Sequence, residues 1–161
     1  MGKIKKFASV QIRKITGGKD PARLVEEFVS KRGFEPSKCA KEKTAESARW
    51  MIPVSDDEEL EILVEGINRH PETTIYMGIN VLTIPIRGAS EVLAAALEIA
   101  DGLIGIKVSL VGHYLVLSAS FPAAGMNIEE LDYNFEIINA QLTWFREALA
   151  DELGWDEMPE D

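Results

Sequence analysis

The side chains in this sequence that could carry out catalysis are few, and their spacing does not assemble a reaction centre. The two histidines lie in predicted turns, His70 beside Pro71 and His113 at the tip of a hairpin. Histidine is a common general base near neutral pH and a common zinc ligand. Neither histidine has a cysteine or a carboxylate at metal-ligand spacing, so we predict two solvent-exposed turn residues. We expect no catalytic residue and no metal site.

Cys39 is the only thiol in the chain, and Lys38, Lys41 and Lys43 lie close to it in the sequence. Positive neighbours can lower the pKa of a thiol and make it reactive. Nucleophilic catalysis also needs a general base and a site for the developing oxyanion, and the sequence identifies neither. We therefore predict a loop cysteine without a catalytic role. A single cysteine forms no internal disulfide, which favours a cytoplasmic protein.

An acidic cluster is the remaining candidate for chemistry, and its members are Glu58, Glu59, Glu61 and Glu65. Carboxylate oxygens bind hard cations, so a metal-dependent enzyme with a site built from Glu58, Glu59 and Glu61 is one alternative. The spacing matches no calcium-binding loop, and three of the four would share one face of a strand. We prefer a solvated strand face, with no metal, no cofactor and no enzymatic activity.

The charge of the chain is unevenly placed, although its net value is −10. Residues 1–49 contain 13 lysines and arginines against 6 acidic residues, whereas residues 50–161 contain 4 against 21. We predict a basic extension at residues 1–19, a folded domain at 20–153 and an acidic tail at 154–161. The extension either docks on the acidic body of its own chain or of a second copy, remains solvated, or binds an acidic partner.

Residues 3–16 carry one apolar stripe, made by Ile4, Phe7, Ala8, Ile12 and Ile15. This pattern predicts a short basic helix that needs a surface to fold against, because isolated helices of this length are unstable in water. The acidic body argues against nucleic acid as a partner, so only residues 1–19 could bind it. No apolar run approaches the ~20 residues of a membrane span.

The apolar periodicity of the rest predicts an α+β fold, with helices packed on an antiparallel sheet of about five strands. In chain order we expect a helix capped by Asp20 and stopped by Gly33, a polar loop at Glu35–Glu46, strands at Ala48–Ser55, Glu58–Ile67 and Thr73–Ile86, a helix at Ala89–Ala100, a hairpin at Ile104–Phe121 and a helix at Asn127–Leu153. Three details are a bulge at Gly78, an N-cap at Ser90, and an inward stripe at Leu93, Leu97 and Ala100.

The hairpin is the best specified element. A two-residue turn at Gly112-His113 pairs Leu110 with Leu115, Val108 with Leu117, and Ile106 with Ala119, all apolar and all on one face. On the other face Val111, Tyr114 and Val116 are apolar on a side that should face water, which makes them candidates for binding a partner.

Two further protein contacts are predicted. Pro53 cannot donate a hydrogen bond within a sheet, which indicates an edge strand at Ala48–Ser55; a partner strand could add there beside Trp50 and Ile52. The last helix has a core stripe and, beside it, a second apolar set that includes Ile137 and Trp144. This second set indicates either the interface of a homodimer or a broad stripe inside a monomer.

Three stretches carry a resemblance to known proteins: Ile106–Leu110, Tyr114–Pro122 and Met126–Leu131. These stretches give a hairpin, a Phe-Pro dipeptide at its end and a helix with a polar N-cap. Over residues 20–153 the chain thereby resembles the YbjN-like family and, more distantly, the type III secretion chaperone-like fold. The resemblance implies a protein-binding module, chaperone-like or regulatory, and often a homodimer. A type III secretion chaperone proper is the alternative. The resemblance supplies no catalytic residue.

Overall fold

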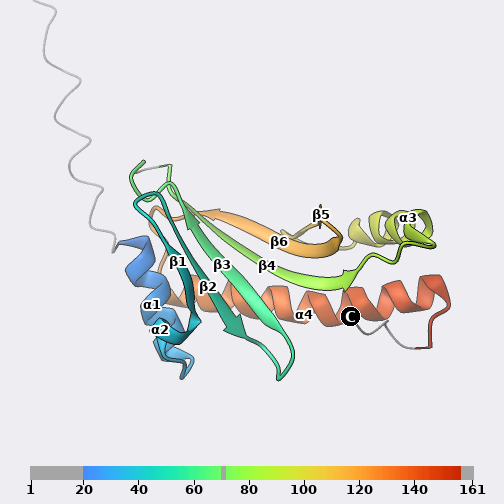
Figure 1. The fold of residues 1–161 in the computed structure, drawn as a ribbon, viewed down its shortest axis with the longest axis horizontal. Helices are drawn as coiled ribbons and strands as arrows, with labels where there is room; N and C mark the ends of the chain where they lie inside the picture. Colours follow the sequence, from blue (N-terminus) through green and yellow to red (C-terminus); the bar gives the residue numbers. More distant parts are fainter. Residues whose placement is uncertain (1–19, 70–71, 157–161) are drawn as a thin grey trace, which may run out of the picture.

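The computed structural model of the protein describes residues 20–69 and 72–156. Its elements, shown in Figure 1, are α1 (Pro21–Lys31), α2 (Pro36–Cys39), β1 (Ala40–Lys43), β2 (Ser47–Pro53), β3 (Glu59–Glu65), β4 (Thr74–Thr83), α3 (Ala89–Ala100), β5 (Lys107–Val111), β6 (Tyr114–Pro122) and α4 (Ile128–Leu153). The predicted basic helix at 3–16, the turn histidine His70 and the end of the acidic tail lie outside the described residues. No helix within the described part is long and apolar enough to cross a membrane.

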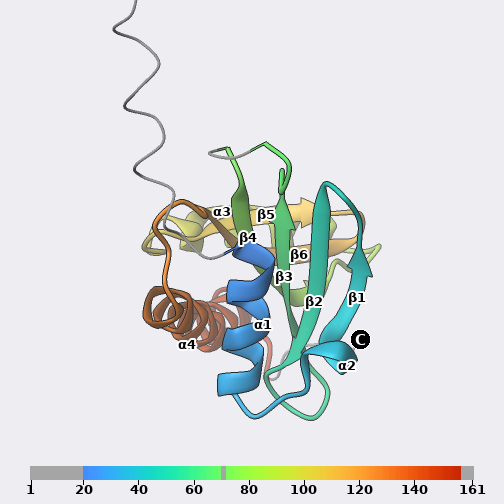
Figure 2. The same ribbon diagram turned by 90° about the vertical axis from the view of Figure 1, so that its left-hand side faces the viewer.

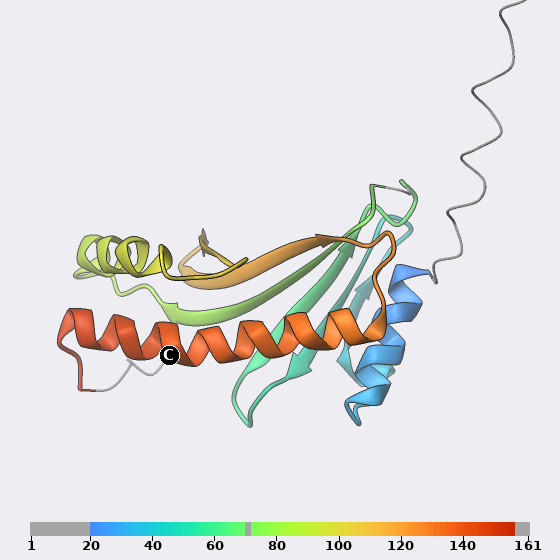
Figure 3. The ribbon, with the colours of Figure 1, turned by 180° about the vertical axis from the view of Figure 1, so that it is seen from behind.

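The six strands form one antiparallel sheet in the order β1-β2-β3-β4-β6-β5. Figure 2 shows α1 and α4 on the same face of this sheet. Helix α3 lies along the C-terminal half of α4, at the end of the molecule away from α1 (Figures 1 and 3). The α+β class predicted from the sequence is confirmed.

The core lies between the sheet and α4. Strand registers place Trp50, Ile62, Met77 and Ala119 in one row across four neighbouring strands, and all four side chains are buried. The core stripe predicted for α4 is confirmed, and its buried members are Leu131, Phe135, Ile138, Leu142, Phe145 and Leu149. Most of the stability of α4 comes from this apolar face rather than from helix propensity.

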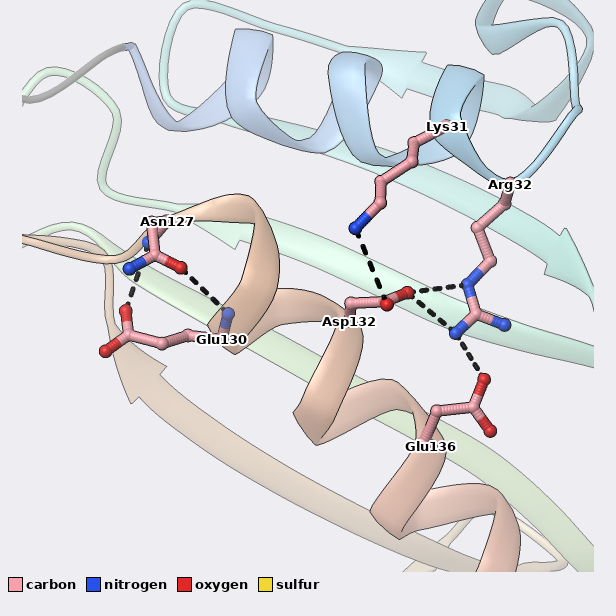
Figure 4. A network of polar contacts seen from close by, with 6 residues as sticks. All are labelled: Lys31, Arg32, Asn127, Glu130, Asp132 and Glu136. Carbon is pink, nitrogen blue, oxygen red and sulfur yellow. Dashed lines mark hydrogen bonds and ion pairs between the residues drawn. The ribbon is translucent and has the colours of Figure 1, made fainter.

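Helices α1 and α4 begin at the residues that the sequence predicts. The Asp20 side chain accepts a hydrogen bond of 3.1 Å from the Ala22 amide, and Pro21 occupies the first helical position of α1. At the start of α4, Asn127 Oδ1 accepts from the Glu130 amide at 2.9 Å, and Glu130 Oε2 accepts from the Asn127 amide at 3.1 Å (Figure 4). This capping box satisfies amides that the helix itself leaves unpaired.

The polar segment after α1 is not the loop that its composition predicts. It forms α2 and then β1, which pairs with β2 through a turn in which the Thr44 amide donates to the Ser47 carbonyl at 2.7 Å. Every residue of β1 is exposed, so the segment lacks the alternation of apolar and polar residues that would predict a strand. Its pairing depends on the neighbouring strand and overrides a weak local preference. The edge strand predicted at Ala48–Ser55 is therefore wrong, because β2 has a neighbour on each side.

The bulge in β4 lies between Asn80 and Leu82 and not at Gly78. A Cβ atom at Gly78 would collide with the ring of Tyr76, so this glycine makes room for an aromatic ring. The bulge leaves two carbonyl groups free for the Arg146 guanidinium, which donates to the Asn80 and Val81 carbonyls at 3.0 Å each. Bulges commonly redirect backbone groups in this way.

Helix α3 also differs from its prediction. Gly88, with φ of 81°, precedes the helix in place of Ser90, whose hydroxyl instead donates to Glu91 at 3.0 Å. The inward residues are Val92, Ala95 and Ala96, whereas Leu97, predicted to face inward, is 70% exposed. Sequence periodicity assumed that the largest apolar residues face the core. The small residues do so here because α3 packs closely against α4.

Candidate protein-binding surface

The structure does not gather the chemically capable side chains into one site. His113 is exposed at the hairpin tip, where its carbonyl accepts from the Ile84 amide at 2.7 Å. Glu58 pairs with Arg146 of α4, whereas Glu61 pairs with Arg49 at 3.4 Å on the opposite face of the sheet. The carboxylates of the alternative metal site are thus divided between two faces. Within residues 20–69 and 72–156, no group of three potential metal ligands occurs.

Cys39 ends α2, and its side chain is buried. Burial raises the pKa of the thiol; Lys41 acts in the opposite direction and Glu59 in the same direction as burial. The thiolate is therefore disfavoured, and the lowering by lysines that the sequence allows is outweighed. This environment is typical of an unreactive core cysteine.

We expect Cys39 to react at least roughly 100-fold more slowly with Ellman's reagent at pH 8 in the native protein than in urea, because a buried thiol with a raised pKa is both hidden and protonated. The control is the same protein in a denaturing concentration of urea, which gives the intrinsic rate. Equal rates would contradict the buried position.

Most large exposed apolar side chains belong to α3, β5 and the segments beside them, which lie toward the end of the molecule away from α1 (Figure 1). Among the described residues, six of the eight large exposed hydrophobic side chains lie between Ile86 and Tyr114. We use the name β5–α3 surface for Leu97, Ile104, Leu110 and Trp144. The Gln141 side chain fixes the turn between α3 and β5 through two hydrogen bonds of 3.1 Å with the backbone of Ile104.

Trp144, predicted as a dimer contact, is the member of this surface that comes from α4. A Cβ atom at Gly102 would lie 2.7 Å from the Trp144 ring, so the indole packs directly on the turn that follows α3. Trp144 remains 43% exposed. Ile137, the other predicted dimer contact, lies earlier in the same helix and is half-buried. The dimer role of these two residues stays a prediction.

The structure divides the predicted partner-binding residues into two groups. The hairpin register is confirmed from Lys107 to Val111, whereas Ile106 lies before β5 and forms no strand pair with Ala119. Val111 and Tyr114 lie opposite each other at the exposed tip. Val116, Trp50 and Ile52 are buried, with 5%, 1% and 0% of their surface exposed. Because each of these three side chains is almost completely covered, a partner finds little of their surface to contact in this conformation.

A groove of about 520 Å³ forms a second candidate surface. Arg32, Phe34 and Val54 line one side of it, and Leu142 and Arg146 of α4 line the other. We call it the arginine groove. Its lining combines apolar and charged residues, which suits an extended protein segment that inserts an apolar side chain. Sequence patterns do not reveal this groove, because its lining comes from the segment after α1, the β2–β3 turn and α4, which are far apart in the chain.

A polar network fixes one wall of the arginine groove (Figure 4). Arg32 Nε and one terminal nitrogen donate to Asp132 Oδ1 at 3.0 and 2.8 Å, and the same nitrogen donates to Glu136. Lys31 Nζ lies 3.7 Å from the other Asp132 oxygen. The Arg32 guanidinium also lies 4.1 Å from the centre of the Phe135 ring. The network joins α1 to α4 across 100 residues of sequence, which local patterns do not reveal.

The hydrogen bond from Arg32 lowers the pKa of Asp132. Because the folded pKa lies below the unfolded value, this pair contributes stability above about pH 4, and the contribution is lost as pH falls through the folded pKa. We expect Asp132→Asn to have a shallower fall in unfolding free energy between pH 5 and 3 than the wild type. Urea denaturation across this range measures it. Asp151→Asn, on the same helix, is the control, and identical slopes for all three proteins would contradict the assignment.

Chains in solved structures share this arrangement at low sequence identity. A chain of the ExsC–ExsE complex matches with a TM-score of 0.56 and 12% identity, over 80% of this chain and 92% of that one. A chain of the HopA1–SchA chaperone–effector complex matches with a TM-score of 0.52 and 12% identity, over 78% and 91%. The chain therefore shares the fold of these two chains over most of its length.

A third match comes from the heterodimeric ExoU–SpcU complex of the type III secretion system of Pseudomonas aeruginosa, with a TM-score of 0.50 and 12% identity, over 77% of this chain and 96% of that one. At this identity the likeness concerns the fold alone. No protein-family model matches the chain, and no curated protein matches its sequence. The resemblance to the YbjN-like family therefore stays a prediction.

Proposed function

We propose that this chain is a non-enzymatic, cytoplasmic module that binds other proteins in a chaperone-like or regulatory role. The observation that carries the proposal is the uncovered apolar surface at α3, β5 and the hairpin tip, where Leu97 and Leu110 are 70% and 53% exposed. Apolar side chains gathered in this way mark protein contacts. The likeness of the fold to chains from chaperone–effector complexes supports the same function.

A second copy of the chain is the partner that we assign to the β5–α3 surface. The surface spans a helix and the edge of a sheet, so it suits a folded partner better than a single extended segment. Strand β5 is an edge strand of the sheet. A two-fold axis beside it would pair β5 with β5 in antiparallel fashion and bring Leu97, Ile104 and Leu110 against their copies.

Light scattering coupled to gel filtration tests this homodimer. We expect the wild type to be a dimer. We expect the dimer dissociation constant of Leu110→Asp to be at least ~100-fold higher than that of the wild type, because this one substitution removes a leucine from both halves of the symmetric interface. Tyr133→Asp is the matched control, since it adds the same charge at an exposed position on the first third of α4. A monomeric wild type, or equal weakening by both substitutions, would contradict the assignment.

A segment of another protein fits the arginine groove. The alternative sites are the sheet edges and the hairpin face. At the β1 edge, Lys41 and Lys43 are exposed, a pattern that discourages strand addition. The groove instead offers Phe34 and Val54, which are both partly exposed, between two arginines. An extended segment with an apolar anchor side chain is the ligand that this chemistry favours.

The test is capture of a partner by the full-length protein, followed by reconstitution of the purified complex. Thr143→Trp places an indole in the groove from an exposed position, and Thr143→Ser is its matched control. We expect the first to lose the partner and the second to keep it. Loss with Tyr114→Ser but not with Thr143→Trp would move the segment to the hairpin face. A protein that forms no reconstituted complex would argue against the function itself.

A type III secretion chaperone proper is the narrower proposal, and the similarity to the complexes above favours it. It requires that the reconstituted partner be a secreted effector held by an extended segment. A resident cytoplasmic partner would favour the regulatory role instead.

A further inference from the structure

A hollow of about 520 Å³ lies where β6 leaves the sheet and α4 begins. Phe121, Pro122, Met126 and Tyr133 give it an apolar lining. Tyr133 is 66% exposed, which is high for an aromatic ring in a folded domain, and it belongs to neither the β5–α3 surface nor the arginine groove. The hollow is therefore a separate apolar site on the described part of the chain.

The hollow lies beside an open stretch of sheet. Strand β5 begins at Lys107, opposite Ser118, so the four residues Ala119–Pro122 of β6 pair with β4 on one side and with no described strand on the other. Backbone groups and apolar side chains are thus uncovered at the same place. An open strand edge over an apolar hollow is where another segment readily packs.

The charge at this site selects a basic occupant. Glu130 is the one charged residue among those that line the hollow, and Glu129 precedes it in the exposed first turn of α4. No lysine or arginine lines the hollow. A segment with lysines at its margin and apolar side chains at its centre would satisfy both features of the site.

The chain itself supplies such a segment. Residues 1–19 contain six lysines and arginines and no acidic residue, and their apolar stripe, which includes Ile4, Phe7 and Ile12, needs a surface. They join the domain at Asp20, the N-cap of α1. Figure 4 shows the first turn of α1 on the same side as Asn127, at the start of α4. At about 3.3 Å per residue, an extended chain of 19 residues reaches up to ~60 Å from Asp20.

We propose that residues 3–16 dock on the hollow of their own chain, with apolar side chains against Phe121, Met126 and Tyr133 and lysines near Glu129 and Glu130. The docked segment covers the apolar lining and leaves the arginine groove and the β5–α3 surface free. The proposal is thus independent of the partner proposed above, and failure of either one leaves the other standing.

The test uses the full-length chain with the photo-crosslinker p-benzoylphenylalanine in place of Tyr133. The control carries the crosslinker in place of Glu147, an exposed residue on the same helix ~21 Å further along. If residues 3–16 are not docked, they reach both position 133 and position 147. If they are docked, they reach only position 133. We expect crosslinks from position 133 to residues 3–16 of the same polypeptide, at least ~10-fold more abundant than from position 147.

Replacing Lys3, Lys5 and Lys6 with glutamate in the same chain is expected to reduce the position-133 crosslink at least ~5-fold, because the charges would then repel. Equal yields from positions 133 and 147, or no crosslink to residues 3–16, would overturn the proposal. Crosslinks found solely between mixed isotope-labelled copies would also overturn it, and would assign the hollow to the segment of a second copy.

Discussion

Trp50→Ala is expected to lower the free energy of unfolding by about 4 kcal/mol, the largest effect of any single substitution considered for this chain. Trp50 is 1% exposed and lies in the row of the core that includes Ile62 and Met77. Its removal leaves a cavity in the middle of the sheet, because neighbouring strands cannot collapse into it. Urea denaturation followed by circular dichroism measures the loss.

Two matched variants separate packing from other causes. The Trp50 indole N–H is buried and has no hydrogen-bond partner among the described residues, so Trp50→Phe sacrifices no hydrogen bond and should cost under ~2 kcal/mol. Trp144→Ala, at a half-exposed indole, should cost about 1 kcal/mol. If Trp50→Ala changed the free energy of unfolding only slightly but abolished binding of the protein partner, Trp50 would be a partner-binding residue at the surface, as the sequence predicted.

Arg32→Ala is expected to cost about 2 kcal/mol of unfolding free energy. The guanidinium makes charge-assisted hydrogen bonds to Asp132 and Glu136 and stacks on Phe135, and each contact joins α1 to α4. The carboxylate side chains are 34% and 62% exposed, so solvent screening keeps the effect well below that of a buried pair. Chemical denaturation measures the total, and hydrogen exchange of the α1 amides shows where the loss occurs.

Arg32→Lys keeps the charge but removes the planar fork and the stacking, so it should recover less than half of the loss. Arg23→Ala is the matched control, because Arg23 pairs with Glu27 at 3.6 Å and has a side chain that is 73% exposed. It should change stability by less than ~0.5 kcal/mol. Similar costs for Arg32→Ala and Arg23→Ala would show that the network in Figure 4 does not hold the two helices together.

The network also has a consequence for binding. Arg32 lines the arginine groove, and its side chain is held between Asp132 and Glu136 rather than free to meet a ligand. At the other end, Arg146 is held by Glu58 and by two carbonyl groups of the β4 bulge. Both arginines therefore shape the groove more than they charge it, which agrees with an apolar anchor as the main feature of the bound segment.

Several parts of the fold could be predicted because their determinants are local. The hairpin register follows from alternation of apolar residues about Gly112-His113, since a slip of one residue would turn every side chain to the wrong face. The capping box at Asn127 and the stop at Gly33 depend on residues within four positions of each other.

Other features were decided by tertiary structure. β1 has no apolar pattern of its own and forms because β2 provides a neighbouring strand, and that pairing makes β2 an internal strand. The outward side chain of Leu97 depends on how closely α3 approaches α4. The arginine groove and the Arg32 network join segments 100 residues apart. Caps, turns and the periodicity of apolar faces thus follow from the sequence alone. Long-range packing decides which faces become core and which become surface, because the burial of a residue depends on its neighbours in space and not on its own type.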